Sequence, residues 1–334
     1  MNIYIISPNP IWGGAATANI SIAKVLAVEH QVFYNDEYNK TDIDNVMYDD
    51  YPVHHLKDSK KLVEYLISKN IDVVVWGIAM NIPYYYKATK KLQNIGIKQL
   101  LIFHSLCIGK SLKSRLMEYL IAKQLTYIDH LVFVSQFTDV SWSKYKSVCK
   151  HPSHNVIYNP IELGKVNTAC EKTNNRIGFV GRFSPEKQPE IFARLSIEDT
   201  RNEYIAWGDG PLLSELKKKY NNVVFKGQSS NQDEIYNSFD ILVMTSEFEN
   251  CPMVILEALK YGIPCVAPNV GGIPEIVKDG YNGVLYDSYT EDEIKSCISK
   301  IQDNYEDFSL NCLAHVHSYS FDALFEEWNA LIKL

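Results

Sequence analysis

The chain has 334 residues, of which 46% are hydrophobic and 22% charged, and its formal net charge is −7. This composition is typical of a soluble globular protein, and the length suggests two domains of ordinary size. The negative charge argues against a general nucleic-acid-binding protein. No apolar run reaches the roughly 18 residues of a membrane-spanning helix. The start, MNIYIISPNP, lacks the basic region and apolar length of a signal peptide.

The cysteines indicate a reducing compartment. They are odd in number, and no two of them have the CxxC spacing of a zinc or redox site. We therefore expect reduced thiols in a cytosolic protein, with no disulfide framework. The seven are Cys107, Cys149, Cys170, Cys251, Cys265, Cys297 and Cys312.

The first half of the chain alternates short apolar runs with helical patterns. The helical patterns include TANISIAKVLAVEH and SKKLVEYLISKN. Strands that are apolar throughout and alternate with helices predict a parallel sheet covered on both faces. The predicted strands are 3–7, 31–34, 72–77, 99–104 and 130–135.

Two features of this half are candidates for ligand contact. Gly13 and Gly14 lie between the first strand and the first helix, where glycines let a ligand approach the backbone, although a plain turn is the alternative. Their spacing is not GxGxxG, which counts against a nicotinamide enzyme. His104 ends the strand at 99–104. A lone histidine is more often structural or exposed.

Residues 87–123 are basic, with seven lysines and one arginine against one acid, Glu118. Within them the predicted helix KSLKSRLMEYLIAKQL carries Leu112, Leu116, Leu120 and Ile121 at helical spacing. One interpretation is a helix that faces the core and has a solvated basic side. The other is a contact with an anionic membrane surface.

A polar stretch at 159–176 is the predicted linker to a second α/β unit. The sequence predicts domains at 1–162 and 163–317, with a C-terminal amphipathic helix at about 318–334 that packs back on the first domain. Two Rossmann-like domains of this kind would face a central cleft at the carboxyl ends of their strands. The second set of predicted strands is 177–181, 203–210, 222–227, 240–246 and 263–268.

The stretch EFENCPMVILEALKYG places two acids around a predicted helix start. With Pro252 as the first helical residue, the N–H groups near Met253 and Val254 would form an anion site suited to phosphate. Glu249 lies before the helix and Glu257 in its second turn, further apart than the about 5–9.5 Å of hydrolase carboxylates. They would instead hold two parts of one ligand.

Locally, an ion pair between Glu257 and Lys260 or another surface base explains the acid at 257 equally well. The wider block SEFENCPMVILEALKYGIPCVAPNVGGIPEIVKDGYNGVLYD (246–287) is more specific. It closely resembles the retaining glycosyltransferases of the GT-B fold, family 4. The resemblance implies that Glu249 contacts the donor sugar and Glu257 the ribose hydroxyls. Asn250 and Cys251 stand where the family often has Gly-Phe.

Upstream, IGFVGRFSPEKQPE (177–190) resembles the family's strand followed by G-R-h-x-x-x-K-G. The resemblance implies that Arg182 and Lys187 bind the donor diphosphate and neutralise its charge as it leaves. Alone, each would be read as a surface base. Gln188 follows Lys187 where the family often has glycine, a difference that leaves the charge unaffected.

The resemblance also assigns weaker contacts. It places Gly208 of WGDGPLLSEL and Gln228 beside the nucleotide, and Gly14 near the donor phosphate. It gives His104 an orienting or proton-handling role. Ser135, Asn159 and GGIPE (271–275) are expected to be structural.

Together these features predict a retaining hexosyltransferase that uses a nucleotide diphosphate sugar, with UDP as the expected nucleotide. The expected acceptor is a saccharide or lipid-linked saccharide in surface polysaccharide or glycolipid assembly. We expect no cofactor and no metal, and the DID at 42–44 lies outside the matched motifs. The expected location is cytoplasmic, with possible peripheral contact on the inner face of the cell membrane.

Three other functions fit the sequence less well. A sugar-nucleotide 2-epimerase shares the architecture, but the E-x7-E block counts against it. A non-catalytic partner subunit would have lost phosphate-binding or acidic residues. All four of those residues are present here: Arg182, Lys187, Glu249 and Glu257. A dehydrogenase lacks its dinucleotide fingerprint.

Overall fold

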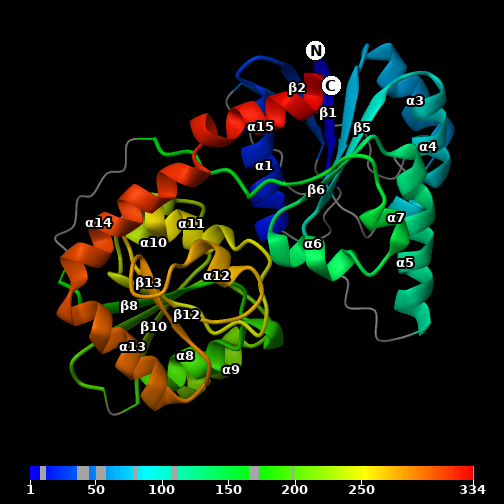
Figure 1. Cartoon of the computed structure of the whole chain (residues 1–334). Helices are drawn as coiled ribbons and strands as arrows, with labels where there is room; N and C mark the ends of the chain where they lie inside the picture. Colours follow the sequence, from blue (N-terminus) through cyan, green and yellow to red (C-terminus); the bar gives the residue numbers. More distant parts are fainter. Residues whose placement is uncertain are drawn as a thin grey trace. The chain divides into compact units, whose positions relative to one another are not determined.

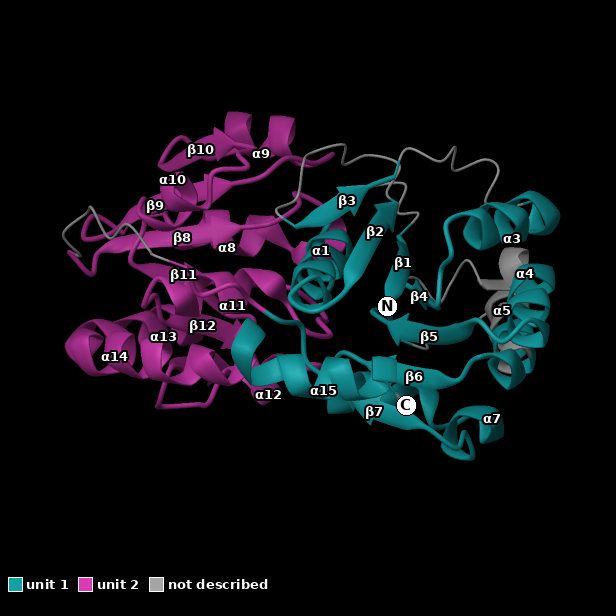
Figure 2. Ribbon diagram, turned by 90° about the horizontal axis from the view of Figure 1, so that it is seen from above, with its two compact units in different colours: residues 1–160, 321–334 teal, residues 161–320 magenta. Residues whose placement is uncertain are grey.

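The computed structural model describes residues 1–7, 13–35, 45–49, 58–77, 82–106, 112–164, 173–197 and 199–333. The chain divides into two compact units (Figure 2). Unit 1 comprises Met1–Pro160 and Phe321–Leu334, and unit 2 comprises Ile161–Ser320. The DID at 42–44, Cys107, Lys110 and Cys170 lie outside the described residues.

Unit 1 contains a seven-stranded parallel sheet with the order β3-β2-β1-β4-β5-β6-β7 (Figure 2). Strands β1, β2, β5 and β6 of this sheet are also labelled in Figure 1. Its centre is apolar on both faces, and Phe103 and Phe133 of neighbouring strands stack with ring centroids 4.6 Å apart. The strands are β1 (Asn2–Ile6), β2 (Gln31–Asn35), β3 (Val46–Tyr48), β4 (Val73–Trp76), β5 (Lys98–Phe103), β6 (His130–Phe133) and β7 (His154–Val156).

Helices cover this sheet on both faces. Three consecutive helices, α3, α4 and α5, pack side by side, while α1 packs against α15 (Figure 2). Helix α15 is fixed by Glu29, which accepts from Asn329 at 3.2 Å and pairs with Lys333 at 3.0 Å. The helices are α1 (Gly14–Leu26), α3 (Ser59–Ser68), α4 (Ile82–Asn94), α5 (Leu112–Gln124), η1 (Leu125–Tyr127), α6 (Gln136–Trp142), α7 (Lys146–Cys149) and α15 (Phe321–Lys333).

Unit 2 contains a six-stranded parallel sheet with the order β10-β9-β8-β11-β12-β13. A buried carboxylate fastens its centre, because Asp240, next to β11, binds the Arg176 guanidinium of β8 at 2.7 Å. The strands are β8 (Arg176–Val180), β9 (Glu203–Trp207), β10 (Val223–Gly227), β11 (Ile241–Val243), β12 (Cys265–Pro268) and β13 (Gly283–Tyr286).

The helices of unit 2 fill the connections between these strands. Helix α11 packs against α10 and α14, and α13 packs against α8 and β13. They are η2 (Pro185–Lys187), α8 (Pro189–Leu195), α9 (Leu213–Lys219), α10 (Gln232–Tyr236), α11 (Met253–Lys260), α12 (Ile273–Ile276), α13 (Glu291–Asp303), α14 (Tyr305–Val316) and η3 (His317–Tyr319).

Both sheets have the doubly wound strand order, in which the first strand of the unit lies centrally and the order reverses beside it. The reversal falls between β1 and β4 in unit 1, and between β8 and β11 in unit 2. Ligands of such sheets bind outside the carboxyl ends of the strands at this switch point. Ligand contacts are therefore expected from the residues that follow β1, β4 and β5 in unit 1, and from those that follow β8 and β11 in unit 2.

The predicted two-sheet fold is confirmed. Three strands, β3, β7 and β13, were not predicted. Strands β3 and β7 have only three residues each, too few to show a pattern. Strand β13 lies inside the 246–287 block, in which the sequence predicted only the strand at 263–268. One local prediction was wrong: Pro252 is the N-cap of α11, and Met253 is its first helical residue.

Candidate active site

The first element of the candidate site is the loop after β8, which carries Arg182. Two glycines of the WGDG turn lie directly against this loop. A Cβ on Gly208 would come within 1.9 Å of the Gly181 carbonyl oxygen, and one on Gly210 within 2.5 Å of the Phe183 carbonyl oxygen. Both glycines also have positive φ, of 130° and 156°. The turn is therefore packed backbone to backbone with the loop that presents the exposed Arg182 side chain.

The same turn is fastened to the end of β10. The Gly208 N–H donates to the Gly227 carbonyl at 2.7 Å, and Gln228, which follows, is exposed. The predicted nucleotide contacts Gly208 and Gln228 thus lie at the ends of adjacent strands. In this arrangement the Gly208 N–H is bonded within the protein and helps to shape the turn.

Lys187 ends η2, and its position is fixed by contacts with the end of β11. The following residue, Gln188, has a left-handed backbone with φ of 45°. The buried Thr245 hydroxyl lies 2.8 Å from the Lys187 carbonyl oxygen and 3.0 Å from that of Gln188. Gln188 Nε2 donates to Glu247 at 3.1 Å. The segment that carries the lysine is therefore tied to the loop that carries the acids.

Glu249 lies in that loop and contacts Lys187 directly. Lys187 Nζ is 2.5 Å from Glu249 Oε1, and the Ser246 hydroxyl donates to the same oxygen at 2.9 Å. The backbone is held too, because the Gly272 N–H donates to the Glu249 carbonyl at 2.9 Å. A Cβ on Gly271 would come within 2.0 Å of that carbonyl oxygen, and the φ of Gly271 is 62°. The GGIPE segment, predicted to be structural, supports Glu249.

Glu257 lies in the second turn of α11 and is half-buried. Its carboxylate accepts from the Tyr236 hydroxyl at 2.5 Å and from Gln232 Nε2 at 3.2 Å, both on α10. Burial raises the pKa of the Glu257 carboxyl, whereas the bonds from α10 and the charge of Lys260 oppose the rise. Burial and the Glu257 charge raise the pKa of Tyr236, so its hydroxyl keeps the proton that it donates.

The start of α11 supplies N–H groups whose partial charge is positive, opposite in sign to the carboxylates of Glu249 and Glu257. The first N–H groups of a helix have no partner within the helix and carry the positive end of its dipole. Here they belong to Met253, whose side chain is buried, and Val254, which is half-buried. The structure gives no side-chain cap at this end of the helix. The N–H groups, Lys187 and Arg182 are the groups of unit 2 suited to a diphosphate.

In unit 1, His104 follows β5 and contacts Asn19 of α1, with Nε2 2.8 Å from Asn19 Oδ1. Asn19 Nδ2 donates to the Ser7 hydroxyl at 2.9 Å and to the Gly77 carbonyl at 3.1 Å. Ser7 and Gly77 follow β1 and β4, so the cluster lies at the switch point of this sheet. Burial lowers the pKa of the His104 imidazole to about 4, and the ring is therefore neutral at pH 7.

The other predicted residues of unit 1 have simpler surroundings. Gly13 caps α1 with an extended backbone, and a Cβ on Gly13 or Gly14 would meet none of the described residues within 4 Å. Gly14 is exposed, so its surroundings leave room for a ligand. Ser135 caps α6 by accepting from the Thr138 N–H at 3.1 Å, as expected of a structural residue.

Sequence reasoning missed the residues that hold the acids and the histidine. Tyr236 and Gln232 precede Glu257 by more than twenty residues, and Asn19 lies 85 residues before His104. The one available signal was Asn19 itself, a polar residue among the apolar positions of a predicted helix.

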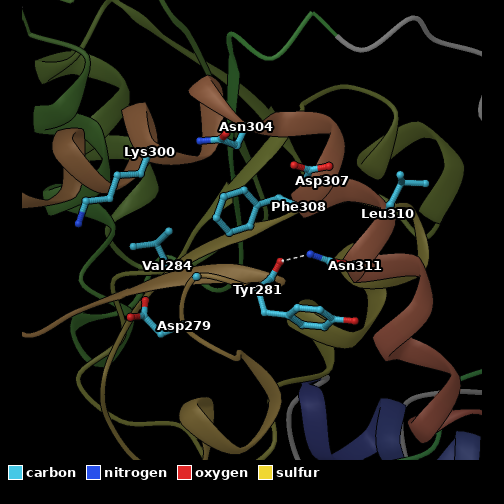
Figure 3. A pocket seen from close by; sticks show the side chains of 10 residues that line it. Asp279, Tyr281, Val284, Lys300, Asn304, Asp307, Phe308, Leu310 and Asn311 are labelled. Atoms are coloured by element: carbon cyan, nitrogen blue, oxygen red, sulfur yellow. Dashed lines mark hydrogen bonds between the residues drawn. The ribbon is translucent and has the colours of Figure 1, made fainter.

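A pocket of about 630 Å³ lies elsewhere in unit 2, at the start of β13 and along α13 and α14 (Figure 3). Tyr281 and Phe308 are among its lining residues, and Asn311 donates to the Tyr281 carbonyl at 3.0 Å. The lining mixes Asp279 and Asp307 with Lys300. It includes none of the predicted site residues, so we assign it no part in the site.

Two kinds of feature are absent from the described ranges. No helix there has the length and apolar character needed to cross a membrane. Within the same ranges, no three side chains of histidine, cysteine, aspartate or glutamate are grouped so that they could hold a metal ion.

Comparison with protein families assigns residues 164–310 to the glycosyl transferases group 1 model. The O-antigen biosynthesis glycosyltransferase WbnH of Escherichia coli is 32% identical over 187 residues, which are 53% of this chain and 54% of WbnH. The chain thus spans about half the length of this curated relative. An uncharacterized glycosyltransferase of Methanocaldococcus jannaschii is 29% identical over 89% of this chain and 87% of its own.

Solved structures match over the whole chain. HepE from Anabaena, solved with UDP-glucose, superposes with a TM-score of 0.79 at 17% identity, covering 100% of this chain and 99% of HepE. Sucrose-phosphate synthase from Thermosynechococcus elongatus gives a TM-score of 0.80 at 15% identity, covering 99% and 98%. At such identities these matches establish the fold alone. The chain therefore has the GT-B fold, and its residues 164–310 match the glycosyl transferases group 1 model.

Proposed function

We propose that this protein is a retaining, metal-independent glycosyltransferase that moves a hexose or N-acetylhexosamine from a UDP-sugar to a saccharide or lipid-linked saccharide. The observation that carries the proposal is the contact of Lys187 with Glu249 beside the start of α11. It joins a cation suited to diphosphate with an acid suited to sugar hydroxyls, inside the matched family domain.

Lys187 can serve both partners at once. An ammonium group has three donors, so it can keep its bond to Glu249 and donate to a phosphate oxygen. Arg182 adds a planar guanidinium, which favours bidentate phosphate contacts. As the bond between the sugar and the diphosphate breaks, negative charge grows on the leaving group. These two cations and the N–H groups of α11 stabilise that charge.

The two acids have separate duties in this proposal. Glu249, held by Lys187 and Ser246, accepts hydrogen bonds from the donor sugar near the reacting carbon. Glu257, anchored on α10, accepts from the ribose hydroxyls. His104 orients a reacting group or handles a proton. Gln228 and Gly208 border the nucleotide, and Gly14 borders the donor phosphate. We assign no nucleophile.

The names of relatives support the choice of nucleotide and of process. WbnH is named for O-antigen biosynthesis, and another relative, 28% identical over 139 residues, is a UDP-Gal:alpha-D-GlcNAc-diphosphoundecaprenol galactosyltransferase of Escherichia coli. HepE was solved with UDP-glucose. A UDP-sugar donor and a role in surface polysaccharide or glycolipid assembly follow as proposals for this chain.

We further propose that α5 contacts the inner, anionic face of the cell membrane. Of the four apolar residues that the core-facing interpretation would bury, only Ile121 is fully buried. Leu112 and Leu116 are 86% and 60% exposed, and Tyr119, one turn on, is 61% exposed. The exposed cations Arg115 and Lys123 belong to the same helix. An apolar strip with basic neighbours is the pattern of an interfacial helix.

A donor screen tests the transferase proposal. UDP-, GDP- and ADP-sugars are compared by nucleotide release and by the shift in melting temperature. We expect UDP-sugars to stabilise the protein and to release UDP, while Glu249→Gln keeps the stabilisation and loses most of the release. If no sugar nucleotide stabilises the protein or turns over, the proposal is wrong.

Vesicle co-sedimentation tests the membrane contact. The Leu112→Ser/Leu116→Ser double variant should lose binding to vesicles that contain phosphatidylglycerol. The matched control is Leu310→Ser/Leu313→Ser, which removes two exposed leucines of α14 in unit 2. Equal binding by both double variants would contradict the assignment to α5.

A further inference from the structure

Asn19 is a buried polar residue on the apolar side of a helix, a place that asparagine seldom occupies without a reason. Its side chain contacts three groups that come from three strand ends: Ser7 after β1, Gly77 after β4 and His104 after β5. Glu257 and Lys187 of unit 2 were recognised from sequence motifs, but no motif marks Asn19.

The contacts determine which way the amide of Asn19 points. A backbone carbonyl can only accept a hydrogen bond, so the group that faces the Gly77 oxygen must be Nδ2, which donates to it at 3.1 Å. Oδ1 therefore faces His104, at 2.8 Å from Nε2. Because Oδ1 has no hydrogen to give, Nε2 must carry one.

Packing leaves the amide little freedom to turn. Asn19 and Ser7 are fully buried, and Gly77 is buried as well. A Cβ on Gly77 would lie 2.4 Å from Asn19 Nδ2, so glycine at 77 is what lets the amide fit there. The orientation of Asn19 is thus set by shape as well as by hydrogen bonding.

A neutral imidazole with hydrogen on Nε2 has its lone pair on Nδ1. We propose that Asn19 is a positioning residue, which orients the His104 ring for the reaction and fixes it as the Nε2–H tautomer. The tautomer follows from the protein alone. Its use in catalysis rests on the proposed glycosyltransferase function.

The test combines imidazole ¹⁵N NMR of the full chain with the pH profile of UDP release from a UDP-sugar. His104→Gln identifies the His104 signals by their loss. The variants are Asn19→Leu, which removes the acceptor, and Asn19→Asp, which keeps an acceptor but adds charge. The matched control is Asn35→Leu, which removes another buried amide at a strand end of unit 1, one that donates to the Asp49 carbonyl at 2.9 Å.

In the wild-type protein we expect the Nε2–H pattern for His104. Asn19→Leu should mix the two tautomers and lower kcat by about tenfold with little change in KM. Asn19→Asp should restore the single tautomer at high pH, and its carboxylate should raise the pKa of His104 and move the acid limb of the profile upward. Asn35→Leu should leave both the tautomer and the profile unchanged.

The outcomes distinguish the positioning role of Asn19 from the proposed glycosyltransferase function. A wild-type Nδ1–H pattern, or an unmixed tautomer in a folded Asn19→Leu variant, overturns the proposal. If Asn19→Leu does not fold, the wild-type spectrum and the Asn19→Asp profile still decide. If the NMR results are as expected but no sugar nucleotide turns over, the positioning role stands and the proposed function fails.

Discussion

The assignment of Glu257 to the ribose makes a quantitative prediction. The perturbation is a pair of substitutions: Glu257→Gln, which keeps an acceptor oxygen and the approximate shape, and Glu257→Ala, which removes both. In the wild-type chain Tyr236 and Gln232 bond the carboxylate from one side of α11. These two bonds hold it still, and its remaining lone pairs are available to the two ribose hydroxyls.

The size of the effect follows from the hydrogen bonds at stake. A hydrogen bond to a charged group contributes about 1.5–3 kcal/mol, and the two bonds share one carboxylate, so we assign them about 2–4 kcal/mol together. Each 1.4 kcal/mol is tenfold in affinity, so Glu257→Ala should weaken UDP binding by about 30- to 700-fold. A neutral amide acceptor keeps roughly half of this free energy, so Glu257→Gln should lose about 5- to 30-fold.

Isothermal titration calorimetry with UDP measures the three affinities. Glu190→Gln is the matched control, because Glu190 also accepts from a tyrosine hydroxyl of unit 2, that of Tyr220 at 3.0 Å, but lies among surface residues. Its UDP affinity should equal that of the wild type. The essential result is that UDP affinity decreases in the order wild type, Glu257→Gln, Glu257→Ala. Equal affinity for wild type and Glu257→Ala, in variants that remain folded, would refute the assignment.

The raised pKa of Glu257 gives this prediction a pH dependence with a definite sign. Hydrogen bonds from ribose favour the charged carboxylate, so the affinity for uridine, which has no phosphate to titrate, should fall as the pH drops through that pKa. The contribution of Glu257 to the stability of the fold should depend on pH in the opposite sense. A carboxyl whose folded pKa lies above its unfolded value stabilises the fold at low pH and loses that contribution as the pH rises. The melting temperature of Glu257→Gln, measured relative to that of the wild type, should therefore increase as the pH rises.

Three further predictions concern turnover, packing and metal. Glu249→Gln should lower kcat by about 10²-fold or more while UDP affinity changes little, since its proposed partner is the sugar; similar UDP affinity loss in Glu249→Gln and Glu257→Gln would contradict the division of roles. Gly208→Ala should lower the melting temperature by roughly 6–12 °C, because its Cβ would overlap the Gly181 carbonyl and about 3 kcal/mol is lost; Gly280→Ala, with φ of 73° and open space around it, should cost far less. Chelation with EDTA should leave UDP release unchanged, and restoration of activity by added Mg²⁺ would show that Arg182 and Lys187 do not suffice.

The sequence predicted local positions well where residues share one segment. Glu249 lies in the loop before α11 and Glu257 in the second turn of that helix, as their spacing indicates. The two sheets were predictable for a similar reason, since most strands are buried apolar runs. The edge strands β3 and β7 were not, because three residues at the border of a sheet carry no periodicity.

Long-range partners were beyond the sequence. Lys187 and Glu249 are 62 residues apart, and nothing in either motif specifies that their side chains meet. The direction of a helix face was equally hidden. Leu112, Leu116 and Ile121 share an apolar pattern, and only the packing of α5 shows that the two leucines are exposed and Ile121 is buried. A helix with apolar residues around much of its circumference cannot indicate from its sequence which side meets the core.

The residue after Lys187 has a backbone conformation that glycine adopts more easily than glutamine. Glycine, usual there in the family, enters the left-handed region freely, whereas Gln188 at φ of 45° costs about 1–2 kcal/mol. Its own side chain offsets part of that through the bond to Glu247, and the Thr245 hydroxyl holds the carbonyls of both Lys187 and Gln188. Pro189 then starts α8 with its φ already set for a helix. The turn that aims Lys187 at Glu249 is thus kept by side-chain contacts in place of a glycine.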